Sequence, residues 1–124
     1  MIQMAYIAAG GALGALMRFW MSNGVYAVLG RAFPYGTLSV NVVGSLIMGI
    51  LYVLLFERLD INVDLRAALI IGLLGAFTTF STFSIETINL LEAGDLLKAL
   101  LNILFSVSLC LIACWLGVVG ARQL

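Results

Sequence analysis

Four long apolar stretches, separated by three short polar ones, account for nearly the whole chain. Each apolar stretch approaches or exceeds the roughly 20 residues that a helix needs to cross a bilayer. Nothing is left over for a soluble domain, so residues 1–124 are expected to form a single all-α membrane domain. The pattern predicts four transmembrane helices, at about Met4–Leu29, Thr37–Phe56, Leu65–Leu91 and Leu96–Val119.

The three polar stretches are predicted loops, and two of them carry capping signals. Asp64 is expected to cap the third helix and Asp95 the fourth, because a side-chain oxygen there can accept a hydrogen bond from a free backbone N–H. Gly94 is expected to end the third helix, since glycine readily adopts the left-handed conformation found after helix C-termini. The loops lie at about 30–36, 57–64 and 92–95.

The third predicted helix is too long for a straight crossing. At 1.5 Å per residue it would measure about 40 Å, well beyond the roughly 30 Å hydrocarbon core. Gly72, Gly75 and a cluster of Thr and Ser residues favour a break near its centre. A break exposes backbone carbonyls, which are tolerated at membrane depth only where protein buries them or they line a cavity.

The content of that helix is as unusual as its length. Five hydroxyl residues and two phenylalanines fill the seven positions from Thr78 to Ser84. Hydroxyls in hydrocarbon need partners, which can be backbone carbonyls one turn back, a neighbouring helix, or water and ions. Five together exceed what helix packing alone usually requires. We interpret the cluster as the lining of a polar path through the membrane.

The first predicted helix carries a stripe of small residues followed by a cation. Gly10, Gly11, Gly14 and Ala15 form the kind of stripe that lets two membrane helices approach closely. Arg18 follows four residues after Gly14. Its guanidinium either snorkels to the membrane surface or faces a wet vestibule that attracts anions.

Other polar residues inside the apolar stretches leave two interpretations open. Asn41 either hydrogen-bonds across helices or lines the path, and Glu86 is either interfacial or an intramembrane carboxylate of the path. The fourth helix carries polar and sulfur-containing residues at i, i+4 spacing, so that they share one face. That face either holds helices together or forms a second wall of the path; its members are Asn102, Ser106, Cys110 and Cys114.

Composition excludes several classes of protein. The chain is 64% hydrophobic and only 10% charged, whereas soluble domains carry roughly a quarter charged residues. Net charge is zero and no basic run occurs, so a nucleic acid partner is not expected. The chain has no histidine, no metal-ligand cluster and no nucleophile motif, so an enzyme is not expected either.

The charges in the loops are nearly balanced between the two sides of the membrane. If the helices alternate, Arg58, Arg66 and Arg122 lie on one side, and Arg31 and Lys98 on the other. The Lys/Arg bias that sets orientation is therefore almost absent. Such a chain can insert both ways, and two antiparallel copies could pair about a twofold axis in the membrane plane.

Three motifs resemble the Fluc (CrcB) family of fluoride channels: Gly10–Arg18, Gly36–Asn41 and above all Gly75–Glu86. The resemblance covers the whole chain in length, helix count and motif order. It implies a passive fluoride-selective channel in the cell inner (plasma) membrane that exports fluoride from the cytoplasm. It further implies an antiparallel dual-topology homodimer with two pores and a structural sodium ion on the dimer axis.

The resemblance also assigns roles to individual residues. Backbone carbonyls of Gly75 and Thr78 would hold the sodium ion, and the ring edges of Phe80 and Phe83 would face fluoride. A phenyl ring has a positive edge, so an edge-on ring can favour an anion. Further positions matched to the ion path are Asn41, Ser81, Thr82, Ser84, Glu86 and Arg18. One departure is the pair Cys110 and Cys114, which stands on a face where relatives can carry hydroxyls.

Two other classes of membrane protein have the same size. A small multidrug transporter also has four helices and can form antiparallel dimers, but it resembles this chain less. Such a transporter carries an essential glutamate in its first helix, and Met4–Leu29 contains no acidic residue. A purely structural four-helix scaffold would not require the hydroxyl cluster.

Overall fold

A computed structural model describes all 124 residues and contains only helices. Four helical spans are long and apolar enough to cross a membrane, and the third is interrupted, as the sequence predicted. The first span is α1 (Ile2–Leu29), and the fourth is α6 (Leu96–Arg122). The second span consists of α2 (Tyr35–Tyr52) and the π-helical η1 (Val53–Arg58). The third span consists of α3 (Val63–Ala67), the π-helical η2 (Ala68–Leu74), α4 (Gly75–Phe77) and α5 (Phe80–Glu92).

The predicted cap of the third span is wrong by two residues. The side chain of Asn62, not of Asp64, accepts a hydrogen bond at the helix start, from the backbone N–H of Asp64 at 2.6 Å. Asp64 already lies inside the first turn of α3, where its negative charge faces the positive end of the helix dipole. Both side chains can cap, and the extended backbone of Asn62 decides between them.

The turn between α5 and α6 confirms the predicted role of Gly94 but not the predicted capping bond of Asp95. Gly94 has a φ of 82°, and its N–H donates to the carbonyl of Leu91 at 3.1 Å. The N–H of Asp95 donates to the carbonyl of Leu90 at 2.9 Å, which completes a Schellman motif. Asp95 occupies the N-cap position of α6, although its side chain makes no capping bond.

The small-residue stripe of α1 packs against the first half of the third span. A Cβ atom on Gly10 would overlap the carbonyl oxygen of Ala68, and one on Gly14 would overlap that of Leu73. A Cβ on Gly72 would in turn meet the backbone of α1 at Ile7. The two backbones are therefore in direct contact, as the stripe predicted.

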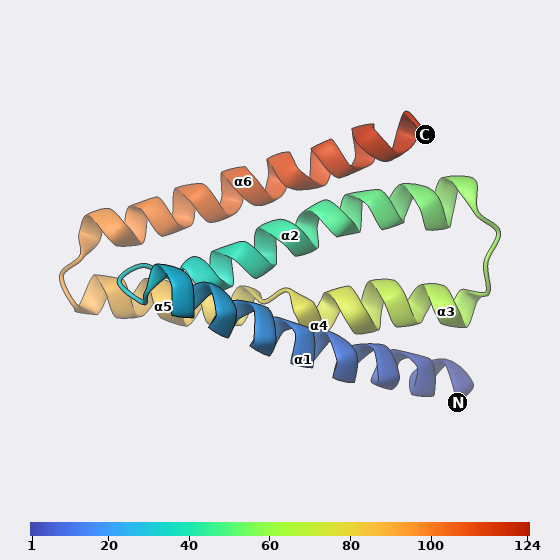
Figure 1. Cartoon of the computed structure of the whole chain (residues 1–124), viewed down its shortest axis with the longest axis horizontal. Helices are drawn as coiled ribbons and strands as arrows, with labels where there is room; N and C mark the ends of the chain where they lie inside the picture. The colour runs from blue at the N-terminus through green and yellow to red at the C-terminus, as the bar shows by residue number, and fades with distance from the viewer.

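A second close crossing joins α2 and α6. A Cβ on Gly49 would overlap the carbonyl oxygen of Cys114, and one on Gly117 would overlap that of Leu46. Figure 1 shows this pair of helices lying along one side of the bundle, with α1 and the interrupted span along the other. Both termini lie at the same end of the molecule, beside the loop that follows η1 (Figure 1).

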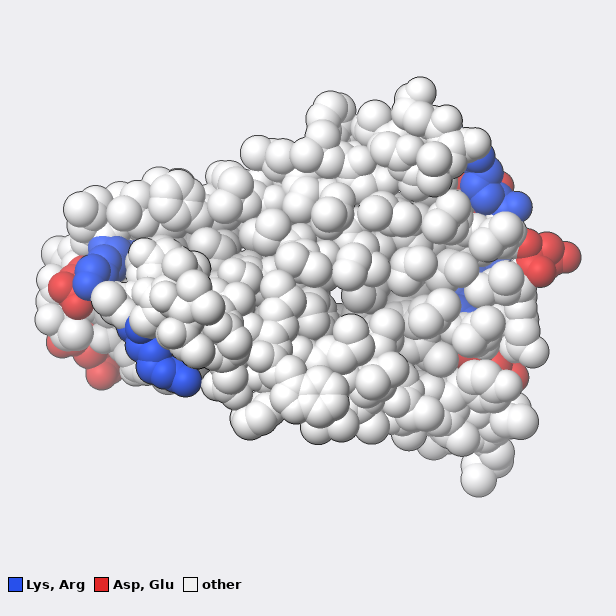
Figure 2. Space-filling view, in the orientation of Figure 1, with Lys and Arg blue, Asp and Glu red and all other residues white.

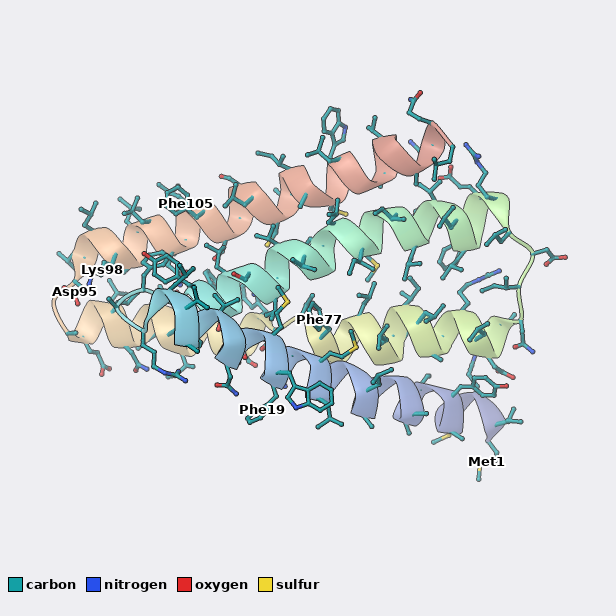
Figure 3. The ribbon with its side chains drawn as sticks, in the orientation of Figure 1. Met1, Phe19, Phe77, Asp95, Lys98 and Phe105 are labelled. Atoms are coloured by element: carbon teal, nitrogen blue, oxygen red, sulfur yellow. The ribbon has the colours of Figure 1, made fainter.

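Charges and apolar side chains are distributed as a bilayer requires. On the face in Figure 2, charged side chains gather at the two ends and the broad middle has none. Only 22 of the 124 residues are buried, so most large apolar side chains face outward into the space that lipid or another subunit fills. Figure 3 shows Phe19 and Phe105 pointing away from the bundle, whereas Phe77, 4% exposed, lies inside it next to the helix break.

Candidate functional site

The third span breaks at Thr78 and Thr79. Both residues are extended, with φ and ψ of −87° and 158° at Thr78 and of −152° and 119° at Thr79. Helix α4 ends at Phe77 just before them, and α5 begins at Phe80 just after them. The break lies inside the hydroxyl cluster, near the middle of the span.

Asn41 of α2 holds the broken backbone in place. Its amide nitrogen donates to the carbonyl of Thr79 at 3.0 Å, and its amide oxygen accepts from the N–H of Thr79 at 2.8 Å. One side chain thus satisfies both backbone groups of a residue that has left the helical pattern. Asn41 therefore makes the hydrogen bond across helices that one of its two interpretations predicts, and it also lines the groove described below, so its place in the ion path stays a prediction.

Thr79 is the residue that sequence reasoning missed. Besides its two bonds to Asn41, it is the N-cap of α5, because its hydroxyl accepts from the N–H of Thr82 at 3.2 Å. It also bonds the hydroxyl of Thr82 at 3.1 Å and that of Ser81 at 3.2 Å. The signal that could have found it is a threonine in the position that N-caps prefer, directly after a suspected break.

Most of the other hydroxyl protons in the cluster are already used. Thr78 donates to the carbonyl of Leu74 at 3.0 Å, and Ser84 donates to the carbonyl of Phe80 at 2.9 Å. Thr82 accepts from Thr79, so its own hydroxyl proton remains available. A free donor of this kind is what an anion needs.

Two carbonyls at the break lose their helical donors. In a continuous helix the N–H of Thr79 would bond to Gly75 and that of Thr82 to Thr78. Here the first N–H donates to Asn41 and the second to the Thr79 hydroxyl. The carbonyl oxygens of Gly75 and Thr78, the two positions matched to the sodium site, are therefore free to bind another group. Backbone carbonyls are ligands that suit a hard cation, so the residues fit such an ion.

Phe80 and Phe83 lie on one side of α5, as their spacing predicts. Their ring centroids are 5.3 Å apart and the planes are tilted by 46°. Both rings border a groove of about 410 Å³ between α2, the helix break and α6. We call it the central groove; it is lined by Asn41, Gly44, Ser45, Met48, Thr78, Thr79, Phe80, Phe83, Ser106, Val107, Cys110, Leu111 and Cys114.

The polar face of α6 divides between its two predicted roles. Asn102 is buried and donates to the hydroxyl of Thr87 at 2.9 Å, which ties α6 to α5. Ser106 bonds the oxygen of Asn102 at 3.4 Å and also borders the central groove. Cys110 and Cys114, which are free thiols, line the groove further along. The first half of the face joins helices, and the second half forms a wall.

Arg18 lies in a separate pocket of about 210 Å³ on the other side of the break. Thr79 borders both this pocket and the central groove, and Thr82 borders the pocket. Arg18 forms no salt bridge; the protein's one salt bridge joins Arg122 to Glu57 at 2.8 Å. Its charge is therefore not neutralised by a carboxylate of its own chain.

Glu86 borders a different pocket from the two phenylalanines. Its carboxylate accepts a hydrogen bond from the hydroxyl of Tyr26 at 2.9 Å, and its second oxygen is buried without a partner. The guanidinium of Arg31 lies 4.4 Å above the Tyr26 ring. These three side chains border a pocket of about 240 Å³ at the end of α5. In one chain, Glu86 does not reach the central groove.

Together the fold and the groove define a multi-pass membrane protein whose helices surround polar groups at a helix break. Residues 5–118 match the family described as CrcB-like protein, Camphor Resistance (CrcB). The chain belongs to this family. In bacteria, four membrane-spanning helices and this family place the protein in the plasma membrane.

Several relatives are named "Fluoride-specific ion channel FluC". One from Methylococcus capsulatus is 59% identical over 118 residues, which cover 95% of this chain and 52% of the relative. The chain thus spans about half the length of that relative. Others from Magnetococcus marinus and Geobacter sulfurreducens are 55% and 50% identical and are covered over 98% and 95% of their lengths. Because these relatives are named as ion channels, which are not enzymes, the expectation that the protein is not an enzyme is confirmed.

Proposed function

We propose that the protein is a passive, fluoride-selective channel that lets fluoride leave the cytoplasm. The observation that carries the proposal is the central groove, where Phe80 and Phe83 lie beside a broken helix. Relatives that share half or more of the sequence are named fluoride channels. No energy source is needed, because an inside-negative potential drives an anion outward by about 2.3 kcal/mol per 100 mV.

The functional unit in this proposal is an antiparallel homodimer with two pores. Phe80 is 78% exposed, and Gly75 and Ser81 are also exposed, although all three lie at the break in the middle of a membrane span. Irregular backbone and polar groups at that depth are not stable against lipid, so another protein surface must cover them. A second copy provides that cover, and the balanced loop charges allow it to insert upside down.

The chemistry of the path follows from the groups around the break. Fluoride sheds water and is met instead by the positive ring edges of Phe80 and Phe83 and by hydroxyl donors such as Thr82. The guanidinium of Arg18, with no carboxylate partner, would attract the anion into the neighbouring pocket. No full charge lines the central groove, so the ion is not held so tightly that it cannot leave. In this proposal Asn41, Ser81, Ser84 and Glu86 are the remaining polar positions of the path.

A sodium ion at the dimer axis completes the proposal. The free carbonyl oxygens of Gly75 and Thr78, doubled by the second copy, would supply oxygen ligands without adding negative charge. When bound, the ion would tie the two broken helices together. The residues that position these carbonyls are Asn41 and Thr79, whose hydrogen bonds withdraw the helical donors.

The experiment that tests the channel is fluoride efflux from liposomes that contain the purified protein. A fluoride electrode should record efflux that stops in the Phe80→Ile/Phe83→Ile double variant. The packing cost of an aliphatic side chain of similar bulk is about 1–2 kcal/mol, which leaves the protein folded. Phe105→Ile is the matched control, because this ring points away from the bundle and should not affect flux (Figure 3). Parental flux in a well-folded double isoleucine variant would show that the rings only pack.

A further inference from the structure

Three sulfur-containing side chains line the central groove. Cys110 and Cys114 stand one turn apart on the same face of α6, and Met48 faces the same groove from α2. Cys110 and Cys114 are the only two cysteines in the chain, and both are free and partly accessible. No carboxylate borders this groove, and the chain has no histidine, so neither a carboxylate nor an imidazole competes with sulfur there.

We infer that Cys110 and Cys114 form a binding site for a soft, two-coordinate metal ion, which blocks the groove when it binds. Residues four apart on a helix have Cβ atoms roughly 5–6 Å from each other, a separation that a linear S–metal–S bridge can span. Thiolate and thioether ligands select soft ions over hard ones. Met48, which borders the same groove from α2, offers a third and weaker sulfur ligand.

The apolar surroundings favour a divalent ion that needs only two ligands, such as Hg²⁺. Two thiols each lose one proton, two S–Hg bonds form, and the product is a neutral bridge with no oxidation or reduction. A neutral product avoids the cost of placing a charge in an apolar environment. Zn²⁺ prefers four ligands, which this groove does not provide. Ag⁺ bound by two thiolates would leave a negative charge on the bridge.

The site lies where a bound ion would obstruct the proposed path. Cys114 lines the groove and stands at the close crossing of α2 and α6, where the Gly49 backbone approaches its carbonyl oxygen. Cys110 shares the groove with Phe80 and Phe83. The inference that the ion blocks flux rests on the proposed channel function, whereas the inference that it binds does not.

The experiment combines a binding measurement with a flux measurement, with Hg²⁺ as the probe. Intact mass spectrometry of the purified protein should show one mercury per chain and the loss of two hydrogens. Fluoride efflux should stop at the same ratio of mercury to protein and recover after addition of a dithiol. Each variant is compared with its own flux in the absence of metal.

Variants separate a bridge from two independent thiols. Cys110→Ser and Cys114→Ser should each weaken the block by about a hundredfold or more, because a bridged ion gains the effective concentration of its second ligand. Met48→Leu should weaken it much less. Two mercury ions per chain, each with one hydrogen lost, would overturn the bridged site. If one mercury bridges the two thiols and fluoride efflux is undiminished, the inference that the bound ion blocks flux is wrong. If the protein shows no efflux even without metal, the proposed channel function is refuted, but the metal site is not.

Discussion

The amide of Asn41 offers a direct test of how the helix break is stabilised. In Asn41→Ala, the N–H and the carbonyl of Thr79 both lose their partner at once. Hydrogen bonds between membrane helices contribute about 0.6 kcal/mol each to stability on average, so losing two of them sets a lower limit of roughly 1 kcal/mol on the destabilisation. Leaving one buried backbone group unsatisfied costs about 1–3 kcal/mol, and because the two groups of Thr79 are only partly buried, their combined cost stays below twice that figure. We therefore expect the free energy of unfolding to fall by between about 1 and 4 kcal/mol.

The assay is unfolding in detergent, followed by the fluorescence of Trp20 and Trp115. Amide hydrogen exchange over residues 75–84 gives a second, local measurement, because the Thr79 N–H should exchange faster in the variant. Asn23→Ala is the matched control: its side chain accepts one bond of 3.3 Å from Arg31 at the surface, so the change should stay within about 0.5 kcal/mol.

One combination of results would refute this account of Asn41. If Asn41→Ala unfolds like the parent and amide hydrogen exchange at the break is unchanged, the two hydrogen bonds do not stabilise the helix break. Loss of fluoride efflux with unchanged stability would assign Asn41 to the ion path alone.

Three further predictions follow from the packing and from the proposed assembly. In thermal unfolding, Gly14→Ala should destabilise the protein by about 1–3 kcal/mol, because the added Cβ overlaps the backbone at Leu73. Gly24→Ala is the control and should stabilise the protein by about 0.5–1 kcal/mol, because its Cβ meets open space. Cysteine introduced at Asn62 in a background without the native thiols should be labelled from both sides of the membrane, and labelling from one side only contradicts dual topology. Replacing sodium by a large organic cation should dissociate the dimer in size-exclusion chromatography. Thr78→Ser should keep the same sodium dependence, because the proposed ligand is a backbone carbonyl. A dimer that is indifferent to sodium would contradict the proposed site.

The features that sequence could predict are those that depend on local composition. Hydropathy locates the four spans, and the excess length with Gly72 and Gly75 locates the break to within a few residues. The spacing of Phe80 and Phe83 predicts adjacent rings, which are 5.3 Å apart. The π-helical turns η1 and η2 have no comparable signal, because their hydrogen-bond register depends on how the spans pack.

The features that sequence could not predict depend on partners far along the chain. Thr79 is held by an amide 38 positions away, and Glu86 is bonded by Tyr26, 60 positions away. Thr78 and Thr79 are neighbours of the same residue type, yet only Thr79 receives the two bonds from Asn41, which no local pattern predicts. The choice between Asn62 and Asp64 as cap likewise depends on the backbone conformation that the loop adopts.

The position of both termini at one end of the molecule restricts how two copies can be joined in a single polypeptide (Figure 1). Four crossings return the chain to the side of the membrane where it began. A short flexible linker from Leu124 to Met1 of a second copy would therefore hold the two copies parallel. A tandem protein with antiparallel halves needs a linker that is itself a membrane span of about 20 apolar residues. The two tandem proteins differ only in their linker, so expressing both would compare parallel and antiparallel pairs built from identical halves.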